Sequence, residues 1–217
     1  MKRRDFLKIS SLSVSAAAIT GLTFGSLRNL YAGSEKGSNS FTFEIITDDP
    51  QKALEISQNF FRNNSFDSTI IKYSEFQLEG EMPGDIVFVN NRELINYKSG
   101  NDKFSNEIRI IARDLSLPKK IKDPTRMRFQ LSESNSPAEN FLVFHKNKLI
   151  ETLRSGSSIT NMNLKGSKGN LLLNIDNGKA KIISADCTHK TCVNTGIISV
   201  SGESIVCIPN EVMILCE

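Results

Sequence analysis

The stretch CTHKTC (Cys187–Cys192), with SIVCIPN (Ser204–Asn210) closely behind it, decides how the C-terminal third of this chain folds. The four cysteines of the chain all lie within its last 31 residues. Around them, short apolar runs alternate with turn signals, and Asn177-Gly178 favours a tight hairpin because both residues tolerate positive φ. These features predict a small all-β, barrel-like unit over residues 138–217.

Cys-Thr-His with further cysteines nearby is typical of the first ligand loop of a Rieske iron–sulfur centre. Such a centre needs Cys-x-His in one loop and Cys-x-x-His in the next. Cys187 and His189 fit the first loop and Cys207 starts the second, but Asn210 stands where the second histidine must be. The other histidine, His145, lies in a different hairpin and is expected at the surface. The sequence therefore argues against an iron–sulfur cofactor.

Two other uses of the cysteines remain open. A zinc site of Cys187, His189, Cys192 and Cys207 has acceptable ligand chemistry, although the spacing is not one of the strong zinc patterns. A structural disulfide is the simpler interpretation, with Cys187 or Cys192 pairing with the other or with Cys207. Such a bridge would stabilise the fold by roughly 2–4 kcal/mol. Sequence alone does not choose among the possible pairings.

The segment from about residue 140 to the end resembles the NusG domain II family. The features that carry the resemblance are VFHKNKLIETLR, DCTHKTCVNTGIIS and GESIVCIPNEVMI. On this resemblance Asn210 is the family's own residue rather than a lost iron ligand. The resemblance implies a small β-barrel-like domain, found inside some NusG factors and alone in exported or membrane-anchored proteins. It implies no particular activity. The chain departs from the family pattern at Ile197, where tryptophan is common, and in its additional Cys216.

The N-terminus predicts export. Arg3 and Arg4, followed by Asp-Phe-Leu-Lys and a weakly apolar run, resemble the twin-arginine (Tat) motif. Residues 1–32 are the expected signal peptide and residues 33–40 a polar linker. We therefore expect the Tat translocase as a partner during export and a periplasmic or extracytoplasmic location. Leu30 is a poor residue ahead of cleavage after Ala32, so the signal is either removed or kept as an anchor.

The charge distribution excludes one class of partner. The chain carries a formal charge of +3, but five of its 27 basic residues and one of its 24 acidic residues lie in residues 1–32. The remainder has a net charge of −1, which gives no electrostatic case for nucleic-acid binding.

Residues 41–132 predict a mixed α/β domain. FTFEIIT (Phe41–Thr47) alternates like a half-buried strand, and Asp48-Asp49-Pro50 predicts the capped start of a helix. Further strands are expected in STIIKYSEF (Ser68–Phe76), DIVFVN, IRIIA and RMRFQL, and Lys119–Lys122 as a solvated loop. The polar run Ser132–Pro137 marks the boundary to the β unit.

The expected fold is thus α+β, with an N-terminal α/β domain of unassigned role and a C-terminal NusG domain II-like β domain. No catalytic residue is identified, and no motif names a cofactor. The predicted function is a non-enzymatic accessory or binding protein with a periplasmic or membrane protein partner. The alternative is a redox or metal-binding protein that uses Cys187, Cys192 and Cys207, and the reactivity of these thiols would separate the two.

Overall fold

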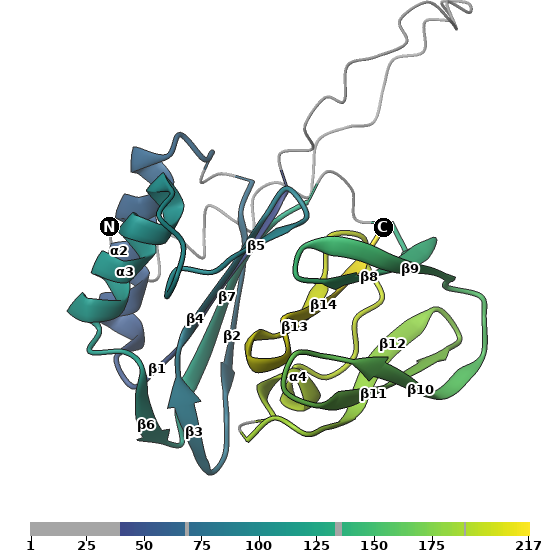
Figure 1. The fold of residues 1–217 in the computed structure, drawn as a ribbon. Helices are drawn as coiled ribbons and strands as arrows, with labels where there is room; N and C mark the ends of the chain where they lie inside the picture. The colour runs from purple at the N-terminus through teal and green to yellow at the C-terminus, as the bar shows by residue number, and fades with distance from the viewer. Residues whose placement is uncertain (1–39, 68–69, 133–135, 189) are drawn as a thin grey trace, which may run out of the picture.

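The computed structural model of the chain describes residues 40–67, 70–132, 136–188 and 190–217. Within them, residues 40–132 form an α/β unit and residues 136–217 a β unit. The elements lie in layers, with two helices on one side of a five-stranded sheet and the β unit on its other side (Figure 1). The expected α+β fold is confirmed.

The five-stranded sheet has the order β2-β7-β1-β4-β5, and every neighbouring pair is antiparallel. Its strands are β1 (Phe41–Thr47), β2 (Lys72–Gln77), β4 (Ile86–Asn90), β5 (Glu93–Ile95) and β7 (Thr125–Leu131). β7, the last of them along the chain, lies between β1 and β2. The β1-helix-β2 connection is therefore a split β-α-β unit in which the two parallel strands do not touch.

Both helices begin at an aspartate. Helix α2 (Pro50–Asn63) starts as predicted, because the Asp49 carboxylate accepts a hydrogen bond from the Lys52 amide at 3.0 Å. Helix α3 (Lys103–Asp114) starts at Asp102 in the same way. The segment IRIIA lies inside α3, so its assignment among the strands is wrong. Ile108, Ile111 and Ala112 recur at helical spacing and pack in the core of the α/β unit, whereas Ile110 is 50% exposed.

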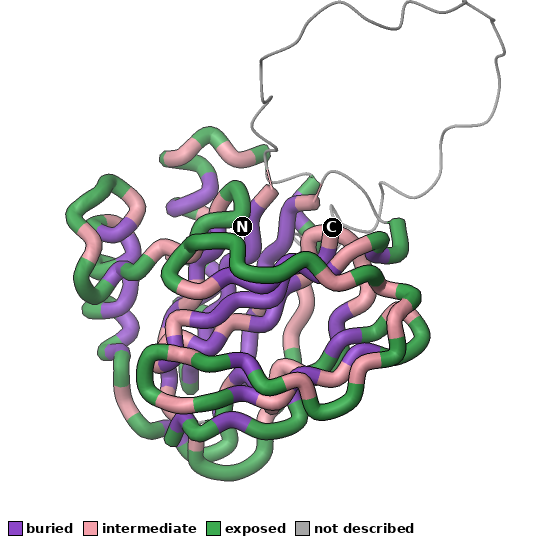
Figure 2. The backbone as a smooth tube through the Cα atoms, turned by 45° about the vertical axis from the view of Figure 1, so that its right-hand side comes forward, coloured by how far each residue is buried: buried purple, intermediate pink, exposed green. Residues whose placement is uncertain are grey.

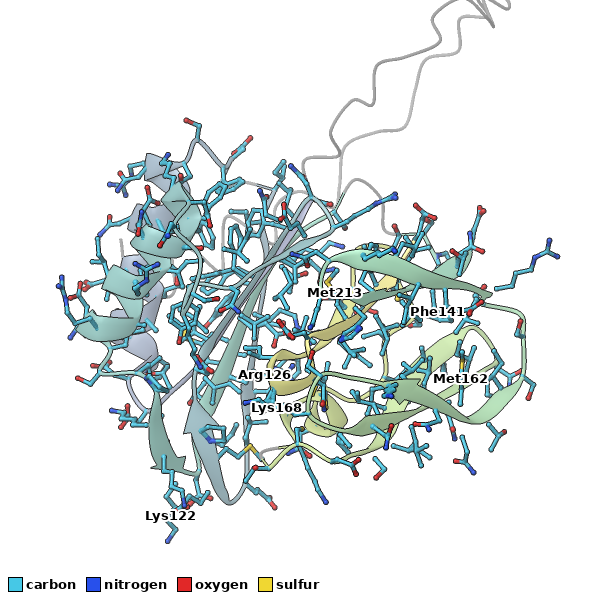
Figure 3. All side chains as sticks on the ribbon, in the orientation of Figure 1. Lys122, Arg126, Phe141, Met162, Lys168 and Met213 are labelled. Atoms are coloured by element: carbon cyan, nitrogen blue, oxygen red, sulfur yellow. The ribbon has the colours of Figure 1, made fainter. Side chains whose placement is uncertain are left out.

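The lysine-rich segment is also a strand. β6 (Lys119–Lys122) pairs with β3 (Glu81–Gly84), and Ile121 is buried between them and the core. Lys120 forms an ion pair with Glu81 at 2.9 Å. The expectation of a solvated loop is therefore wrong. Lys122 faces solvent (Figure 3), and Lys119 forms an ion pair with Asp48 at 2.9 Å.

The β unit consists of two antiparallel sheets. A four-stranded sheet has the order β13-β14-β8-β9, with strands Ser204–Cys207, Val212–Cys216, Asn140–His145 and Lys148–Arg154. A three-stranded sheet has the order β10-β11-β12, with strands Ile159–Lys165, Asn170–Asp176 and Lys179–Ala185. The hairpin residues Asn177 and Gly178 have φ values of 49° and 72°, which confirms the predicted turn. No closed barrel forms among the strands that the structure describes.

The four-stranded sheet is a middle layer with two apolar faces. Alternate residues of β8 and β14 point to opposite sides. Phe141, Val143 and Ile214 pack in the core of the β unit, whereas Phe144 and Met213 pack against Val87 and Val89 of β4. Figure 3 shows Phe141 on the side of the β unit and Met213 toward the five-stranded sheet, and Figure 2 shows buried backbone running through the middle of the molecule.

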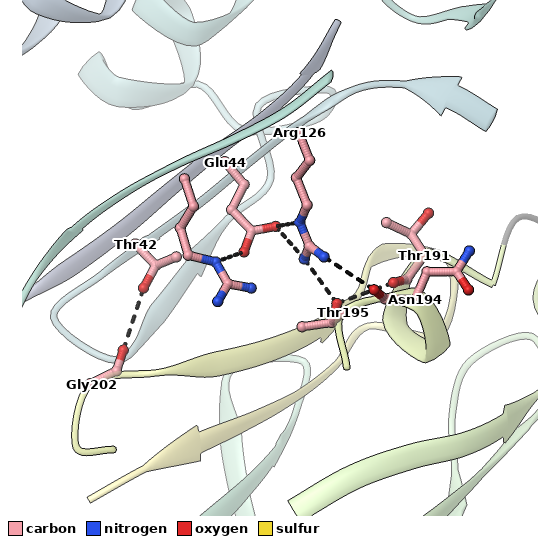
Figure 4. Close-up of polar contacts among 8 residues, drawn as sticks. Thr42, Glu44, Arg126, Thr191, Asn194, Thr195 and Gly202 are labelled. Carbon is pink, nitrogen blue, oxygen red and sulfur yellow. Dashed lines mark hydrogen bonds and ion pairs between the residues drawn. The ribbon is translucent and has the colours of Figure 1, made fainter. Parts of the chain in front are cut away.

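Strand β1 is buried along its whole length, so the expectation of a half-buried strand is wrong. Phe41, Phe43 and Ile45 face the helices, as the alternation predicts. The opposite face carries Thr42 and Glu44, and the β unit covers it. Thr42 Oγ1 donates a hydrogen bond to the Gly202 carbonyl at 3.4 Å (Figure 4).

Glu44 forms a buried ion-pair cluster at this boundary. Its carboxylate lies 2.7 Å from Arg126 Nη2 and 2.6 Å from Arg128 Nε, both on β7. The Glu44 and Arg126 side chains are only 8% and 5% exposed. Burial by itself would raise the pKa of Glu44, but the two guanidinium groups outweigh it and hold that pKa below its usual range.

Among the described residues, no helix is long and apolar enough to span a membrane.

Replacing Glu44 by Gln should lower the free energy of unfolding by about 3–5 kcal/mol, because it leaves a buried guanidinium charge without its partner. Urea denaturation of the two proteins measures the difference. Glu81→Gln is the matched control. It removes an ion pair whose two side chains are 74% and 60% exposed, and such pairs contribute about 0–1 kcal/mol. Equal effects of the two substitutions would contradict a structural role for the Glu44 cluster.

The same cluster sets a pH dependence. Because the pKa of Glu44 is lower in the folded state, its contribution is complete above the unfolded-state pKa of about 4.3 and is lost as pH falls through the folded-state value. The stability difference between wild type and Glu44→Gln should therefore shrink in acid below about pH 4. A difference that stays constant down to pH 2 would rule this out.

Candidate functional site

Three cysteines, one from a loop, one from a helix and one from a strand, meet at the edge of the β unit. Cys187 follows β12, Cys192 lies in the short helix α4 (Thr191–Asn194), and Cys207 is the last residue of β13. Their sulfur atoms all lie within 4.8 Å of one another, and all three side chains are buried. The Cys187 and Cys192 Sγ atoms are 3.9 Å apart. The structure thus brings together the three cysteines that are the disulfide candidates in the sequence.

All four cysteines are thiols in the structure. Cys216 is buried in β14 and is not part of the three-cysteine group. The expected disulfide among Cys187, Cys192 and Cys207 stays a prediction, and the structure places its candidate partners together. His189, the fourth residue of the zinc hypothesis, lies outside the described residues. His145 is at the end of β8, where its Nε2 atom is 3.1 Å from Ser167 Oγ.

The α/β unit holds α4 in place. Arg126, which binds Glu44 on one side, donates hydrogen bonds on the other to the Asn194 carbonyl at 3.3 Å and to Thr195 Oγ1 at 3.0 Å (Figure 4). Thr195 in turn donates to the Thr191 carbonyl at 3.1 Å. The helix that carries Cys192 is thus tied by its C-terminal end to the central sheet.

The three thiols do not share one acidity. A hydrogen bond from the Cys192 thiol, together with the Asn210 amide and against the effect of burial, lowers the pKa of Cys207 to about 6. The shared hydrogen bond with Cys207, and then burial, raise the pKa of Cys192. Burial is the main cause that raises the pKa of Cys187. Cys207 is therefore the most acidic thiol of the group, with a pKa below its ordinary value while the pKa values of its two neighbours lie above theirs.

Asn210 is fully buried, and its side chain forms two hydrogen bonds. Its Nδ2 atom donates to Cys207 Sγ at 3.3 Å, and its Oδ1 atom accepts from the Lys168 amide at 3.1 Å. The loop containing Lys168 approaches so closely that a Cβ on Gly166 would lie 2.9 Å from the Asn210 carbonyl oxygen. Asn210 therefore joins the thiol group to the β10–β11 turn.

A cavity of about 310 Å³ lies between the two units, and the three thiols line it. Its wall is largely apolar, formed by Ile46, Pro83, Val87 and Pro118 of the α/β unit and by Val206, Ile208 and Pro209 of the β unit. We call it the interface cavity. Because each unit supplies part of the wall, the cavity depends on the packing of one unit against the other.

Charged groups in the interface cavity are already paired. The Asp85 carboxylate accepts from Lys98 Nζ at 2.6 Å and from the Tyr97 hydroxyl at 2.5 Å. Burial, followed by the neighbouring Asp85 carboxylate, raises the pKa of Tyr97. Glu44 also lines the cavity, where both arginines engage it.

Sequence reasoning identified the cysteines of this site but none of its residues from the α/β unit. Asp85 and Lys98 stand in ordinary strand and turn contexts, and no spacing links them to Cys207. Glu44 was the one weak indication in the sequence. A glutamate in a largely apolar strand predicts a buried ion-pair partner, but only when both faces of that strand are known to be covered.

The site and its surroundings define a class of protein: a small two-sheet β module with a buried three-thiol group, attached to an α/β unit. Comparison with known proteins assigns the module. The NusG domain II family model matches residues 125–217. The chain therefore belongs to the NusG domain II family through this segment, which begins with β7 and includes Arg126.

Three solved structures are similar to part of this chain. A DUF1312 family protein from Ruminococcus gnavus is 31% identical, with 36% of this chain and 96% of that chain covered and a TM-score of 0.32. A DUF1312 family protein from Enterococcus faecalis is 24% identical, with 36% and 94% covered and a TM-score of 0.34. The Lin0431 protein from Listeria innocua is 20% identical, with 37% and 94% covered and a TM-score of 0.34. No curated protein matches the chain.

Alkylation by iodoacetamide should detect the acidity of Cys207. In reduced protein, its modification rate should be half-maximal at a pH of about 6, because only the thiolate reacts. In Asn210→Ala the loss of the amide donor should move this midpoint upward. Mass mapping of the modified peptides follows each cysteine. The exposed Asn163→Ala is the control and should leave the midpoint unchanged. An ordinary midpoint above pH 8 in the wild type would contradict the assignment.

Proposed function

We propose that this chain is a non-enzymatic binding or accessory protein that acts outside the cytoplasm, and that the interface cavity binds a small ligand. The observation that carries the proposal is the cavity itself: about 310 Å³ of space, at the lower end of the range for ligand pockets. Its largely apolar wall and its few oriented polar groups have the composition of a binding site.

The chemistry of the cavity favours a particular kind of ligand. The apolar residues of both units would cover an apolar body. Lys98 and Asp85 would orient a polar group, since they already form a fixed donor and acceptor pair. A highly charged ligand is disfavoured because it would have to displace the existing partners of Glu44 and Asp85.

Nile red, a neutral apolar dye, tests this proposal with the intact protein. It should bind saturably with one site per chain, as followed by its fluorescence. Val206→Trp should weaken binding by at least about 10-fold, because the added ring fills the cavity from the β unit. Ile150→Trp is the control: Ile150 is 48% exposed on β9, away from the cavity wall, and the variant should bind normally. Absence of saturable binding, or equal binding by Val206→Trp, would overturn the proposal.

The proposed location rests on the N-terminal motif. Replacing Arg3 and Arg4 by lysine should stop export, so that full-length precursor accumulates in the cytoplasm, as immunoblots of cell fractions would show. Arg28→Lys makes the same chemical change in the same segment but outside the motif, and it should leave export intact. Continued export of the double variant through the general secretory route would exclude the Tat assignment.

Thiol exchange is the second candidate function. The observation in its favour is that Cys207, the most acidic of the thiols, lies with Cys187 and Cys192 in one group beside a cavity. Oxidation of Cys187 and Cys192 would form one S–S bond and transfer two electrons and two protons to an external disulfide. Such a redox pair is reduced readily by glutathione, whereas a structural bridge resists it.

A further inference from the structure

The three-cysteine group has the dimensions of a metal site. A metal ion bound by thiolates at about 2.3 Å places its sulfur ligands about 4 Å apart. The Cys187 and Cys192 sulfur atoms are 3.9 Å apart, and Cys207 Sγ lies within 4.8 Å of both. Small side-chain adjustments would therefore bring all three sulfur atoms to one ion. Cys187 and Cys192 come from one loop and its short helix, and the fold brings Cys207 of β13 to them.

Residues around the three-cysteine group orient its sulfur atoms, as expected for metal ligands. Metal ligands are usually oriented by hydrogen bonds from a second layer of residues. Asn210, which is fully buried, donates such a bond to Cys207 Sγ at 3.3 Å and is itself held by the Lys168 amide. Helix α4, which carries Cys192, is held by Arg126. Two of the three ligand positions are thus fixed by contacts outside the group.

The nearby carboxylates are committed elsewhere. Asp186, next to Cys187 in sequence, accepts a hydrogen bond from the Asn170 amide at 2.8 Å. Glu44 is bound by two arginines, and Asp85 by Lys98 and Tyr97. The ligand set within the described residues is therefore sulfur alone. Soft thiolates favour Cu(I) and Zn²⁺ over Mg²⁺, Ca²⁺ or Mn²⁺.

We infer that Cys187, Cys192 and Cys207 form a three-thiolate site for one thiophilic metal ion, Cu(I) or Zn²⁺, whose open side faces the interface cavity. All three cysteines line the cavity, so a further ligand can reach the ion from there. The site is distinct from the proposed binding of an apolar molecule and does not require it. It excludes a disulfide within the group, since one bridge removes two of the three ligands.

Metal titration of the whole chain, reduced and kept free of oxygen, tests the inference. Co²⁺ serves as the spectroscopic probe. It should bind with one equivalent and give the intense near-ultraviolet sulfur-to-cobalt absorption of three thiolates. Zn²⁺ should displace it, and a parallel titration with Cu(I) against a chromophoric Cu(I) chelator should identify the preferred ion. Preference for either ion supports the site. Because these readouts use the wild-type chain, they do not depend on the folding of any variant.

Substitutions then assign the ligands. Cys187→Ser, Cys192→Ser and Cys207→Ser should each weaken binding by at least about 10-fold, and Asn210→Ala by about 10-fold through the lost second-layer contact. Cys216→Ala is the matched control, since Cys216 is equally buried in the same unit but outside the group, and it should bind normally.

Three results would overturn the inference. The first is a cobalt spectrum without thiolate absorption. The second is wild-type affinity in the three serine variants. The third is a Cys187–Cys192 or Cys207 disulfide in exported protein that mild reductant does not open. A protein that binds metal but does not bind the dye would contradict the proposed binding of an apolar ligand and would leave the metal site supported.

Discussion

The buried ion pair between Glu44 and Arg126 is the interaction on which the arrangement of the two units depends. A carboxylate on the central strand is tolerable in the interior only because two guanidinium groups reach it. Arg126 then uses its remaining donors on Asn194 and Thr195 of the β unit. The Arg126 side chain therefore compensates the charge of the Glu44 carboxylate and also fixes the orientation of the β unit on the sheet. Apolar packing around Met213 and Val89 adds area to this boundary, but that packing alone is not directional.

The local features of the fold were predictable because their causes are local. The Asp49 cap, the proline at the start of α2 and the Asn177-Gly178 turn each act through a few neighbouring residues. Long-range features were not. That β7 inserts between β1 and β2 depends on pairs as distant in sequence as Phe41 and Leu131, for which the sequence carries no register signal. The burial of Glu44 could not be predicted either, because alternation reports one covered face and cannot report a second layer.

The candidate site divides in the same way. The positions of Cys187, Cys192 and Cys207 around short strands of one small β unit made them the disulfide candidates, but that all three sulfur atoms lie together is known only from the structure. Asn210 was identified by the family resemblance, but its role follows only from the structure, in which it joins Cys207 to the turn at Lys168. No sequence motif identifies Ile46, Val87 and Lys98 as residues of a cavity wall. The interface cavity forms only where the surface of the α/β unit meets that of the β unit, and the sequence of each unit by itself does not indicate this contact.

The three cysteines are held in position by different parts of the structure. Cys187 and Cys207 are fixed by the β unit itself, through strands β12 and β13. Cys192 lies on a helix of one turn, and such a helix is not stable on its own. Its position is maintained by Arg126, a residue of the other unit that is included in the family segment 125–217. Arg126 therefore connects the ion-pair cluster at Glu44 to the helix that carries Cys192, in addition to the contacts that this helix makes with β12 and β13 of its own unit.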